Sequence, residues 1–241
     1  MTKFTDGVLQ YSELFGPTIQ GEGPSLGRLA AFLRLAQCNL DCAWCDTSYT
    51  WDWSGANGVV YDPAVEVQEA TVAAAFHRLA AMNAPLIVVT GGEPLLQQTT
   101  LTELCGELQA IGLDVEIETN GTIAPRQAFA DVVTRFNVSP KLANSGIAWN
   151  RRLKGDPLEA LQATGKASFK FVCHDESDLD EVEAIVRGAN LRPRDVWVMP
   201  LGKSANQVSN GTTRLAGATI ERGYNLTTRL HVLIWGAIRG V

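Results

Sequence analysis

The 241-residue sequence has no run of basic residues, and no apolar stretch approaches the roughly 20 residues that a membrane-spanning helix needs. Its formal net charge is −6 at pH 7, which argues against strong binding to a nucleic-acid backbone and favours a small-molecule partner. The first six residues lack the apolar core of a signal peptide. We therefore expect a cytoplasmic protein with no membrane segment and no direct nucleic-acid partner.

Internal repeats, low-complexity segments and linkers are also absent, although glycine, asparagine and proline over residues 51–63 predict an extended loop. The hydrophobic fraction is 46% and the charged fraction 19%, which excludes a disordered or coiled-coil chain. A single domain over residues 1–241 is the expectation.

Short apolar runs, partly β-branched, predict seven strands. They cover residues 29–36, 86–90, 114–119, 131–139, 167–173, 196–199 and 229–235. Between most of them, apolar residues recur at helical spacings of three and four. This alternation predicts an α/β fold with a parallel sheet, and it leaves open a doubly wound sheet or a complete or partial barrel. In either fold the site lies at the carboxyl ends of the strands.

Polar and glycine-rich residues follow six of the predicted strands. They are Cys38 and residues 91–94, 118–121, 139–141, 173–175 and 199–200. Because the carboxyl ends of parallel strands meet at one edge of a sheet, we expect these segments to gather on one rim.

Three of the five cysteines, Cys38, Cys42 and Cys45, lie close together in the sequence. Thiolates at spacings of four and three suit one cubic iron–sulfur cluster, and three ligands leave one iron free for a cofactor or substrate. The alternative is a zinc site completed by a distant residue. The candidates for that residue are His77, His174, His231, Cys105 and Cys173, and we assign the last two to the core.

The cysteine spacing, with Trp44 just before the third cysteine, resembles the cluster motif of radical S-adenosylmethionine enzymes. Residues 90–94 (TGGEP) are similar to the GGEP element of that superfamily, whose backbone meets the methionyl amino group of the cofactor. On its own this element is equally a strand-to-helix turn. The resemblance implies a partial (βα)6-type barrel, a 4Fe-4S cluster and S-adenosylmethionine.

Longer motifs resemble the 7-carboxy-7-deazaguanine synthase family over nearly the whole chain. They are residues 15–24 (FGPTIQGEGP), 32–35 (FLRL), 38–47 (CNLDCAWCDT), 118–121 (ETNG), 139–141 (SPK) and 230–236 (LHVLIWG). The departures are residues 53–61, which are longer than expected, and residues 173–175. The resemblance implies a lyase that contracts the ring of 6-carboxy-5,6,7,8-tetrahydropterin to 7-carboxy-7-deazaguanine, with loss of ammonia, in queuosine and related 7-deazapurine biosynthesis. It further implies a homodimer and a flavodoxin- or ferredoxin-type electron donor.

The resemblance also assigns residues to each ligand within a substrate loop (residues 15–28), a cluster loop (residues 38–47) and the strand ends. Cys38, Cys42 and Cys45 hold the cluster, and Thr47 ligates Mg²⁺. The residues expected at S-adenosylmethionine are Trp44, Asp46, Gly92, Glu93, Ser139, Pro140 and Lys141. Those expected at the pterin are Ile19, Gln20, Gly21, Glu22, Arg34, Thr90, Glu118 and Asn120. No side chain is expected to be catalytic, since the cofactor supplies the radical.

Structural interpretations compete at several of these positions. Arg34 stands in an apolar strand and needs an anion, which is either the pterin carboxylate or an internal acid. Glu22 is equally a surface acid of a glycine-rich hairpin, and Asn120 equally a turn residue. Asp46 and Thr47 together are also typical of a helix cap or turn.

Two other functions compete with the pterin chemistry. An enzyme that activates a partner protein uses the same cluster, but needs a peptide groove and often further cysteine clusters, which the sequence lacks. A zinc-stabilised binding module would be colourless and would not cleave S-adenosylmethionine.

Overall fold

The computed structural model describes residues 4–241, so the first three residues of the segment tested for a signal peptide lie outside it. Its centre is a nine-stranded sheet in the order β3-β1-β2-β4-β5-β6-β7-β8-β9. The strands are β1 (Val8–Ile19), β2 (Leu29–Leu35), β3 (Gln68–Thr71), β4 (Leu86–Gly91), β5 (Asp114–Thr119), β6 (Arg135–Val138), β7 (Ala167–Cys173), β8 (Val196–Pro200) and β9 (Asn225–Leu226). Neighbouring strands from β2 onward are parallel, whereas β1 is antiparallel to both β2 and β3.

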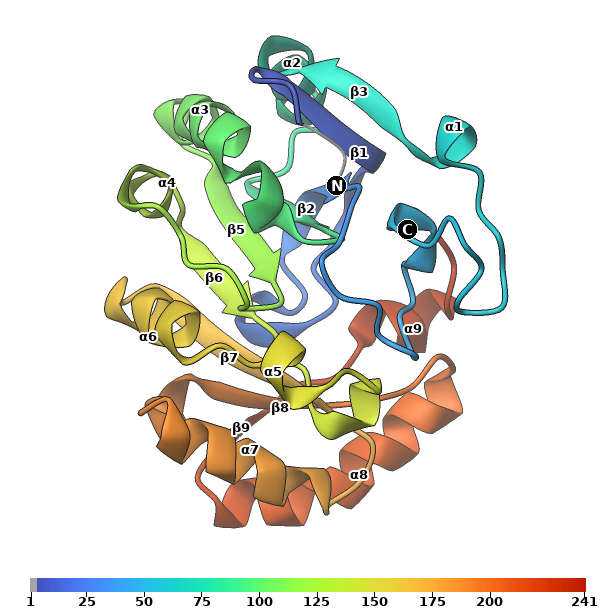
Figure 1. Cartoon of the computed structure of the whole chain (residues 1–241), viewed down its shortest axis with the longest axis vertical. Coiled ribbons are helices and arrows are strands. Elements are labelled where there is room, and N and C mark those ends of the chain that lie inside the picture. Colours follow the sequence, from blue (N-terminus) through green and yellow to red (C-terminus); the bar gives the residue numbers. More distant parts are fainter. Residues whose placement is uncertain (1–3) are drawn as a thin grey trace.

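The helices pack along this sheet (Figure 1). They are α1 (Pro63–Glu66), α2 (Val72–Ala80), α3 (Gln98–Ala110), α4 (Gln127–Asp131), α5 (Trp149–Arg152), α6 (Gly155–Ala163), α7 (Asp178–Gly188), α8 (Ala205–Glu221) and α9 (Leu230–Trp235). The sheet curves, with α2, α3, α4, α6, α7 and α8 along its outer side and α9 on the inner side (Figure 1). The predicted α/β fold with a mostly parallel sheet is confirmed.

Local sequence signals explain where several helices begin. The side chains of Thr71 and Ser204 cap α2 and α8 by accepting hydrogen bonds from the backbone N–H groups of Ala74 and Gln207. Helix α7 carries three acidic residues in its first turn and Arg187 in its last, as the helix dipole favours. None of the described helices meets the length and hydropathy that crossing a membrane requires.

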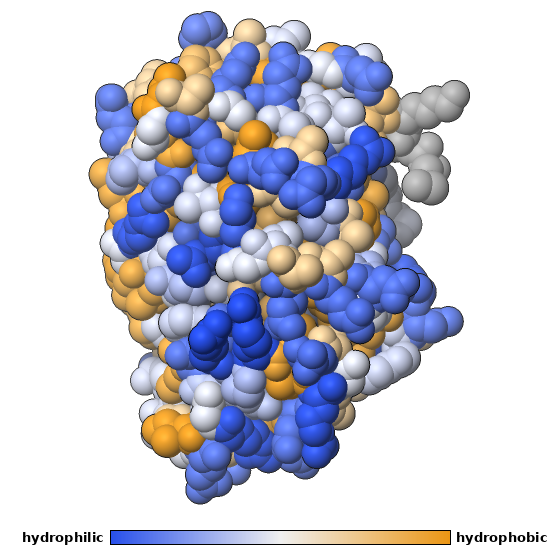
Figure 2. Space-filling view, turned by 90° about the vertical axis from the view of Figure 1, so that its left-hand side faces the viewer, coloured by the Kyte–Doolittle hydropathy of each residue, from blue (hydrophilic) through white to orange (hydrophobic). Residues whose placement is uncertain are grey.

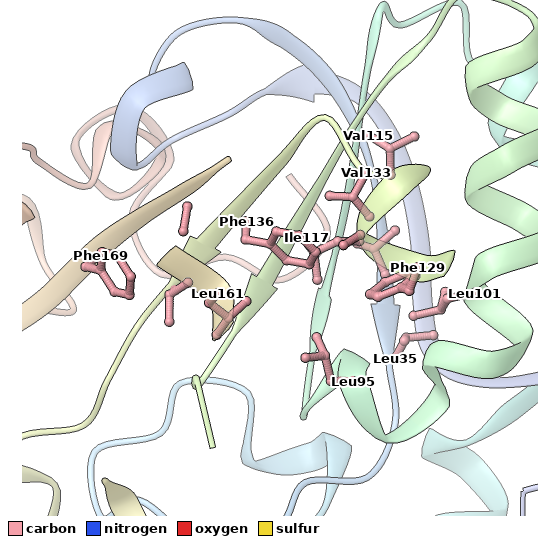
Figure 3. Packing of buried hydrophobic residues seen from close by; sticks show 14 of the residues in the cluster. Leu35, Leu95, Leu101, Val115, Ile117, Phe129, Val133, Phe136, Leu161 and Phe169 are labelled. Atoms are coloured by element: carbon pink, nitrogen blue, oxygen red, sulfur yellow. The ribbon is translucent and has the colours of Figure 1, made fainter. Parts of the chain in front are cut away.

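The main core lies between the sheet and the outer helices. Ile117 and Phe136 of the strands pack towards Leu101 of α3 and Phe129 of α4 (Figure 3). Cys105 and Cys173 are buried in the same core, and burial raises the pKa of Cys105 to about 12. On the face shown in Figure 2, hydrophilic residues are interspersed with apolar ones.

Five predicted strands are confirmed to within a residue at each end: 29–36, 86–90, 114–119, 167–173 and 196–199. The strand predicted over 131–139 is shorter, because its first residues complete α4 and the turn after it. Strand β1 was not predicted, since Gly16 and Pro17 interrupt its apolar pattern, and the pairing of β1 with β2 shifts register between Phe15 and Thr18.

The strand predicted over residues 229–235 is wrong. Residues 230–235 form α9, and the two residues of β9 occupy the last position of the sheet. A short apolar run does not by itself distinguish a strand from a helix, and within α9 only Val232 is buried. The backbone N–H of Leu230 donates to the carbonyl of Gly21 at 2.8 Å, so α9 lies against the substrate loop.

Candidate active site

Two adjoining cavities lie at the carboxyl ends of the parallel strands. The cluster cavity, of about 160 Å³, is lined by the three motif cysteines, and the loop cavity, of about 170 Å³, is lined by residues 19–22 and Arg34. Six side chains line both cavities: Glu22, Asp46, Thr47, Thr90, Glu118 and Arg229. The two cavities are therefore parts of one site.

The structure brings together all but two of the residues predicted from the sequence. Those in the cluster cavity are Glu22, Cys38, Cys42, Trp44, Cys45, Asp46, Thr47, Thr90, Gly92, Glu118, Asn120, Ser139 and Lys141. The loop cavity adds Ile19, Gln20, Gly21 and Arg34. Glu93 and Pro140 line neither cavity.

The cluster loop folds around its three thiols. Cys38 and Cys45 pack against a small apolar group formed by Leu40, Cys42 and Ile147. Burial raises the pKa of Cys38 to about 12, and the nearby carboxylate of Glu93 and the other two thiols add to this shift. Burial also raises the pKa of Cys42, so Cys38 and Cys42 are both disfavoured as thiolates, a cost that a cationic iron cluster relieves.

The donor set fits a cluster better than a single ion. Within residues 4–241, no three His, Cys, Asp or Glu side chains lie close enough together to hold one metal ion. The three thiols line the same cavity. Such an arrangement suits several irons bridged by sulfide.

The glycine turn after β4 passes directly over the end of β2. The N–H of Gly92 donates to the Leu35 carbonyl at 3.0 Å, and a Cβ atom at Gly92 would overlap the carbonyl oxygen of Gln37. Only glycine fits at this crossing. The backbone of the turn is consequently held beside Cys38.

The side chain of Glu93 serves the framework of the site. It is fully buried and accepts hydrogen bonds from the N–H of Leu95 (3.0 Å), the Thr119 hydroxyl (2.7 Å) and the N–H of Asn120 (2.7 Å). Burial raises the pKa of Glu93 despite these bonds. The side chain of Glu93 thus joins the ends of β4 and β5. A contact between the backbone of Glu93 and S-adenosylmethionine stays a prediction.

Glu22 is the anionic centre of a buried charge network. Its carboxylate pairs with the Lys170 ammonium and accepts from Nε of Arg229 at 2.9 Å, and Arg229 also pairs with Asp46. Burial raises the pKa of Glu22, but the two cations outweigh it and hold the pKa far below its usual range. With its side chain 13% exposed, Glu22 is not a surface acid.

The residues that line the cavities but were not among the predicted ones include Lys170, Arg229 and His231. Lys170 stands alone as a charge in the apolar run of β7, the same signal that pointed to Arg34. Burial lowers the pKa of His231 below 6.5, and a Cβ atom at Gly21 would overlap the His231 ring. The close approach of α9 to the substrate loop thus requires glycine at position 21.

Glu118 joins the substrate loop to β4. The Gln20 amide donates to Oε1 of Glu118 at 3.1 Å, and the Thr90 hydroxyl donates to Oε2 at 2.6 Å. Asn120 lines the cluster cavity, but its amide donates to Asn39 and its oxygen accepts from the N–H of Thr122. Asn120 therefore also forms the turn that its sequence context indicated.

Arg34 has both an internal partner and an open side. Its Nε donates to Oε2 of Glu13 at 2.7 Å, and the same oxygen accepts from the Tyr49 hydroxyl at 2.6 Å. Neither terminal nitrogen of Arg34 makes a hydrogen bond within the described chain, and the residue lines the loop cavity. The ion pair therefore occupies one edge of the guanidinium and leaves the terminal nitrogens for a ligand.

Thr47 does not cap the 3₁₀ turn that follows it. It occupies the N-cap position of Ser48–Thr50, but its side chain makes no capping hydrogen bond. The hydroxyl instead lies 3.7 Å from the Cys45 sulfur, and Thr47 lines both cavities. The neighbouring carboxylate of Asp46 is engaged by Arg229.

Comparisons with known proteins agree with this geometry. Residues 34–171 match the family model of the radical SAM superfamily. The chain is 36% identical over 230 residues to the 7-carboxy-7-deazaguanine synthase of Pyrobaculum aerophilum, with 95% of each chain covered. It is 33% identical over 238 residues to that of Hyperthermus butylicus, covering 97% of this chain and 95% of the relative. The crystal structure of QueE from Escherichia coli has a similar fold, with a TM-score of 0.68, 24% identity, and 91% of this chain and 93% of that chain covered.

We predict that Glu13→Gln destabilises the protein at neutral pH by about 1–3 kcal/mol, because a carboxylate that accepts from Tyr49, Arg34 and Arg239 loses its charge. Burial raises the pKa of Glu13, but these partners outweigh it and the net pKa lies below 4.5. The stabilisation is therefore complete above the unfolded-state pKa and is lost as the pH falls through the folded-state pKa. Urea unfolding of both proteins at several pH values measures the difference.

The matched control for this measurement is Glu69→Gln, whose carboxylate accepts an exposed hydrogen bond from Gln10 on the neighbouring strand. Its effect should stay within about 0.5 kcal/mol at every pH. A Glu13→Gln effect as small as the control, or one that grows as the solution is acidified, would contradict the prediction.

Proposed function

The chain belongs to the radical S-adenosylmethionine superfamily and, within it, to the 7-carboxy-7-deazaguanine synthases, and on this premise we propose how its residues serve that reaction. It is an enzyme with a 4Fe-4S cluster and S-adenosylmethionine as cofactors, and its reaction is the ring contraction of 6-carboxy-5,6,7,8-tetrahydropterin to 7-carboxy-7-deazaguanine with loss of ammonia. The observation that carries the assignment is the joined pair of cavities, one lined by the three thiols and the other by the substrate loop.

Cys38, Cys42 and Cys45 are the residues that would hold the cluster. When bound, the cluster and S-adenosylmethionine supply a 5′-deoxyadenosyl radical that removes hydrogen from the substrate. Lys141 would bind the carboxylate of S-adenosylmethionine through its ammonium group. This group lies 5.5 Å from the centre of the Trp44 ring and donates to the Ser139 hydroxyl at 3.0 Å. The tight turn at Gly92 lines the same cavity.

Gln20, Thr90 and Glu118 would bind the aminopyrimidine edge of the pterin. A carboxylate accepts from the ring's N–H groups, and an amide matches an alternating pattern of donors and acceptors. The existing bonds from Gln20 and Thr90 to Glu118 fix the direction in which that carboxylate faces. This prior orientation lowers the cost of ordering the side chains when substrate binds.

Arg34 would bind the carboxylate of the pterin through its two terminal nitrogens. A planar guanidinium held at Nε presents these nitrogens as a pair, which is the geometry for a bidentate contact with a carboxylate. Glu13 and Tyr49 position this side chain from behind, through the shared oxygen Oε2 of Glu13.

Thr47 would be a ligand of Mg²⁺, with the substrate filling other coordination positions. Its hydroxyl is not used as a helix cap, and it lies in the overlap of the two cavities, between the cysteines and Arg34. Mg²⁺ retains waters and often binds through its substrate, so a single neutral protein ligand is sufficient.

The resemblance to the family extends the proposal to partners. We propose a flavodoxin- or ferredoxin-type protein as the electron donor and a homodimer as the assembly. The thiol ligand set supports a reducing compartment, for which we propose the cytoplasm.

An anaerobic assay tests the proposed function. Protein reconstituted with iron and sulfide should be brown, bind about four irons per chain, and convert the carboxypterin while forming 5′-deoxyadenosine. Omission of Mg²⁺ should lower product formation and leave the cluster intact. Ala at Cys38, Cys42 or Cys45 should abolish iron binding, whereas Ala at the buried Cys105 or Cys173 should not.

Three results would contradict this function. Zinc without iron uptake would indicate a structural metal site. Iron loss only in the Cys105 or Cys173 variants would place the cluster elsewhere. Cleavage of S-adenosylmethionine without conversion of the carboxypterin would leave a partner protein as the substrate.

Arg34→Lys tests the identity of the substrate. The change keeps the positive charge but removes the bidentate geometry, so affinity for the carboxypterin should fall by about 1.5–3 kcal/mol. Binding of S-adenosylmethionine should be nearly unchanged. Isothermal titration calorimetry with each ligand measures both effects.

The control ligand is a pterin without the carboxylate, which should bind the wild type and the Arg34→Lys variant about equally. If the variant instead has a lower melting temperature and binds both ligands more weakly to the same extent, then Arg34 serves only its ion pair with Glu13.

A further inference from the structure

The loop after the cluster motif, residues 51–62, lies between the cluster loop and α1 (Figure 1). The proposed reaction assigns it no role. Its first residue, Trp51, lines the cluster cavity. The indole Nε1–H of Trp51 donates to the sulfur of Cys45 at 3.4 Å. Because an indole nitrogen donates and does not accept, the bond directs a positive dipole at this sulfur.

Asp52 holds the loop in one shape. Its side chain is buried, and Oδ1 accepts from the N–H groups of Ser54 (3.2 Å), Gly55 (2.9 Å) and Ala56 (3.0 Å), while Oδ2 accepts from that of Asn57 (2.8 Å). Burial raises the pKa of Asp52, but these bonds outweigh it and keep the pKa below its usual range. Asp52, which directly follows Trp51, therefore holds residues 54–57 in a closed turn.

A second contact ties the turn to the cluster loop. The side-chain amide of Asn57 donates to the carbonyl oxygen of Cys42 at 3.2 Å. The backbone N–H of Trp51 donates to the Ser48 carbonyl at 3.1 Å. Trp51 is thus held on both sides, which keeps its indole directed at Cys45.

Trp44 provides a comparison within the same site. It directly precedes Cys45, but its indole N–H donates to Oδ1 of Asn144 at 3.0 Å. Two tryptophans therefore lie near one cysteine, and only the indole of Trp51 is bonded to the sulfur.

We propose that Trp51 raises the reduction potential of the cluster by donating its indole N–H to the Cys45 thiolate. Hydrogen bonds to ligand sulfurs are one of the factors that set the potential of an iron–sulfur cluster. One-electron reduction, by the flavodoxin- or ferredoxin-type donor, adds negative charge to the cluster and its sulfurs. A donor fixed on one sulfur stabilises the reduced form more than the oxidised form. This inference rests on the proposed function insofar as it requires the cluster.

The test is a redox titration of the reconstituted protein, followed by the electron paramagnetic resonance signal of the reduced cluster. Trp51→Phe keeps an aromatic ring in the cavity and removes the N–H. Iron content should be unchanged, while the ratio of reduced to oxidised cluster at the wild-type midpoint falls about tenfold, a shift of about 59 mV to a more negative potential. Trp53→Phe, in the same loop, should leave the potential at the wild-type value.

A second measurement decides the case in which Trp51→Phe does not retain its cluster. In wild-type protein with ¹⁵N in its tryptophan indoles, electron–nuclear double resonance on the reduced cluster should detect one coupled ¹⁵N nucleus, that of Trp51. The coupling should persist in Trp53→Phe.

Three outcomes would overturn the inference: an unchanged potential in iron-loaded Trp51→Phe, an equal shift in Trp53→Phe, or no ¹⁵N coupling in the wild type. A cluster whose potential is independent of Trp51 contradicts this inference alone. Failure of the wild type to bind any cluster would contradict the proposed function as well.

Discussion

The buried ion pairs of Glu22 connect the segments that form the site. Glu22 comes from the substrate loop, Lys170 from β7 and Arg229 from the residue before α9, and Arg229 reaches on to Asp46 in the cluster loop. Removal of one partner would leave a buried charge uncompensated, at a cost of about 3–5 kcal/mol. The network therefore fixes the position of the loop cavity relative to the cluster cavity.

Such a network is a weak source of stability, since well-packed apolar residues serve a core equally well. Its role is to position the segments that form the site. Arg229 donates to Glu22, to Asp46 and to the carbonyl oxygen of Gly202 at 2.7 Å, so one guanidinium joins three separate segments. The glycines at positions 21 and 92 let backbone and ring atoms approach where a side chain would prevent it. Together these contacts keep the two cavities open to each other.

The sequence predicted what depends on local pattern. The cysteine spacing, the glycine turn and five buried strands follow from periods and spacings of a few residues, and the structure confirms the strands. The charge partners could not be predicted, because Lys170 and Arg229 lie 148 and 207 residues from Glu22 in the chain. The apolar run of α9 was misread as a strand because a short apolar run suits a strand and a helix equally, and its contact with the substrate loop is not visible in the sequence.

Glu22→Gln measures most directly whether this network aligns substrate with the cluster. The variant keeps a polar side chain of the same size but removes the charge that pairs with Lys170 and Arg229. If the account is correct, the anaerobic protein still binds about four irons per chain and forms 5′-deoxyadenosine, while the ratio of deazaguanine product to 5′-deoxyadenosine falls at least tenfold. A ratio equal to that of the wild type would show that the two cavities are aligned without the network, and would contradict the account.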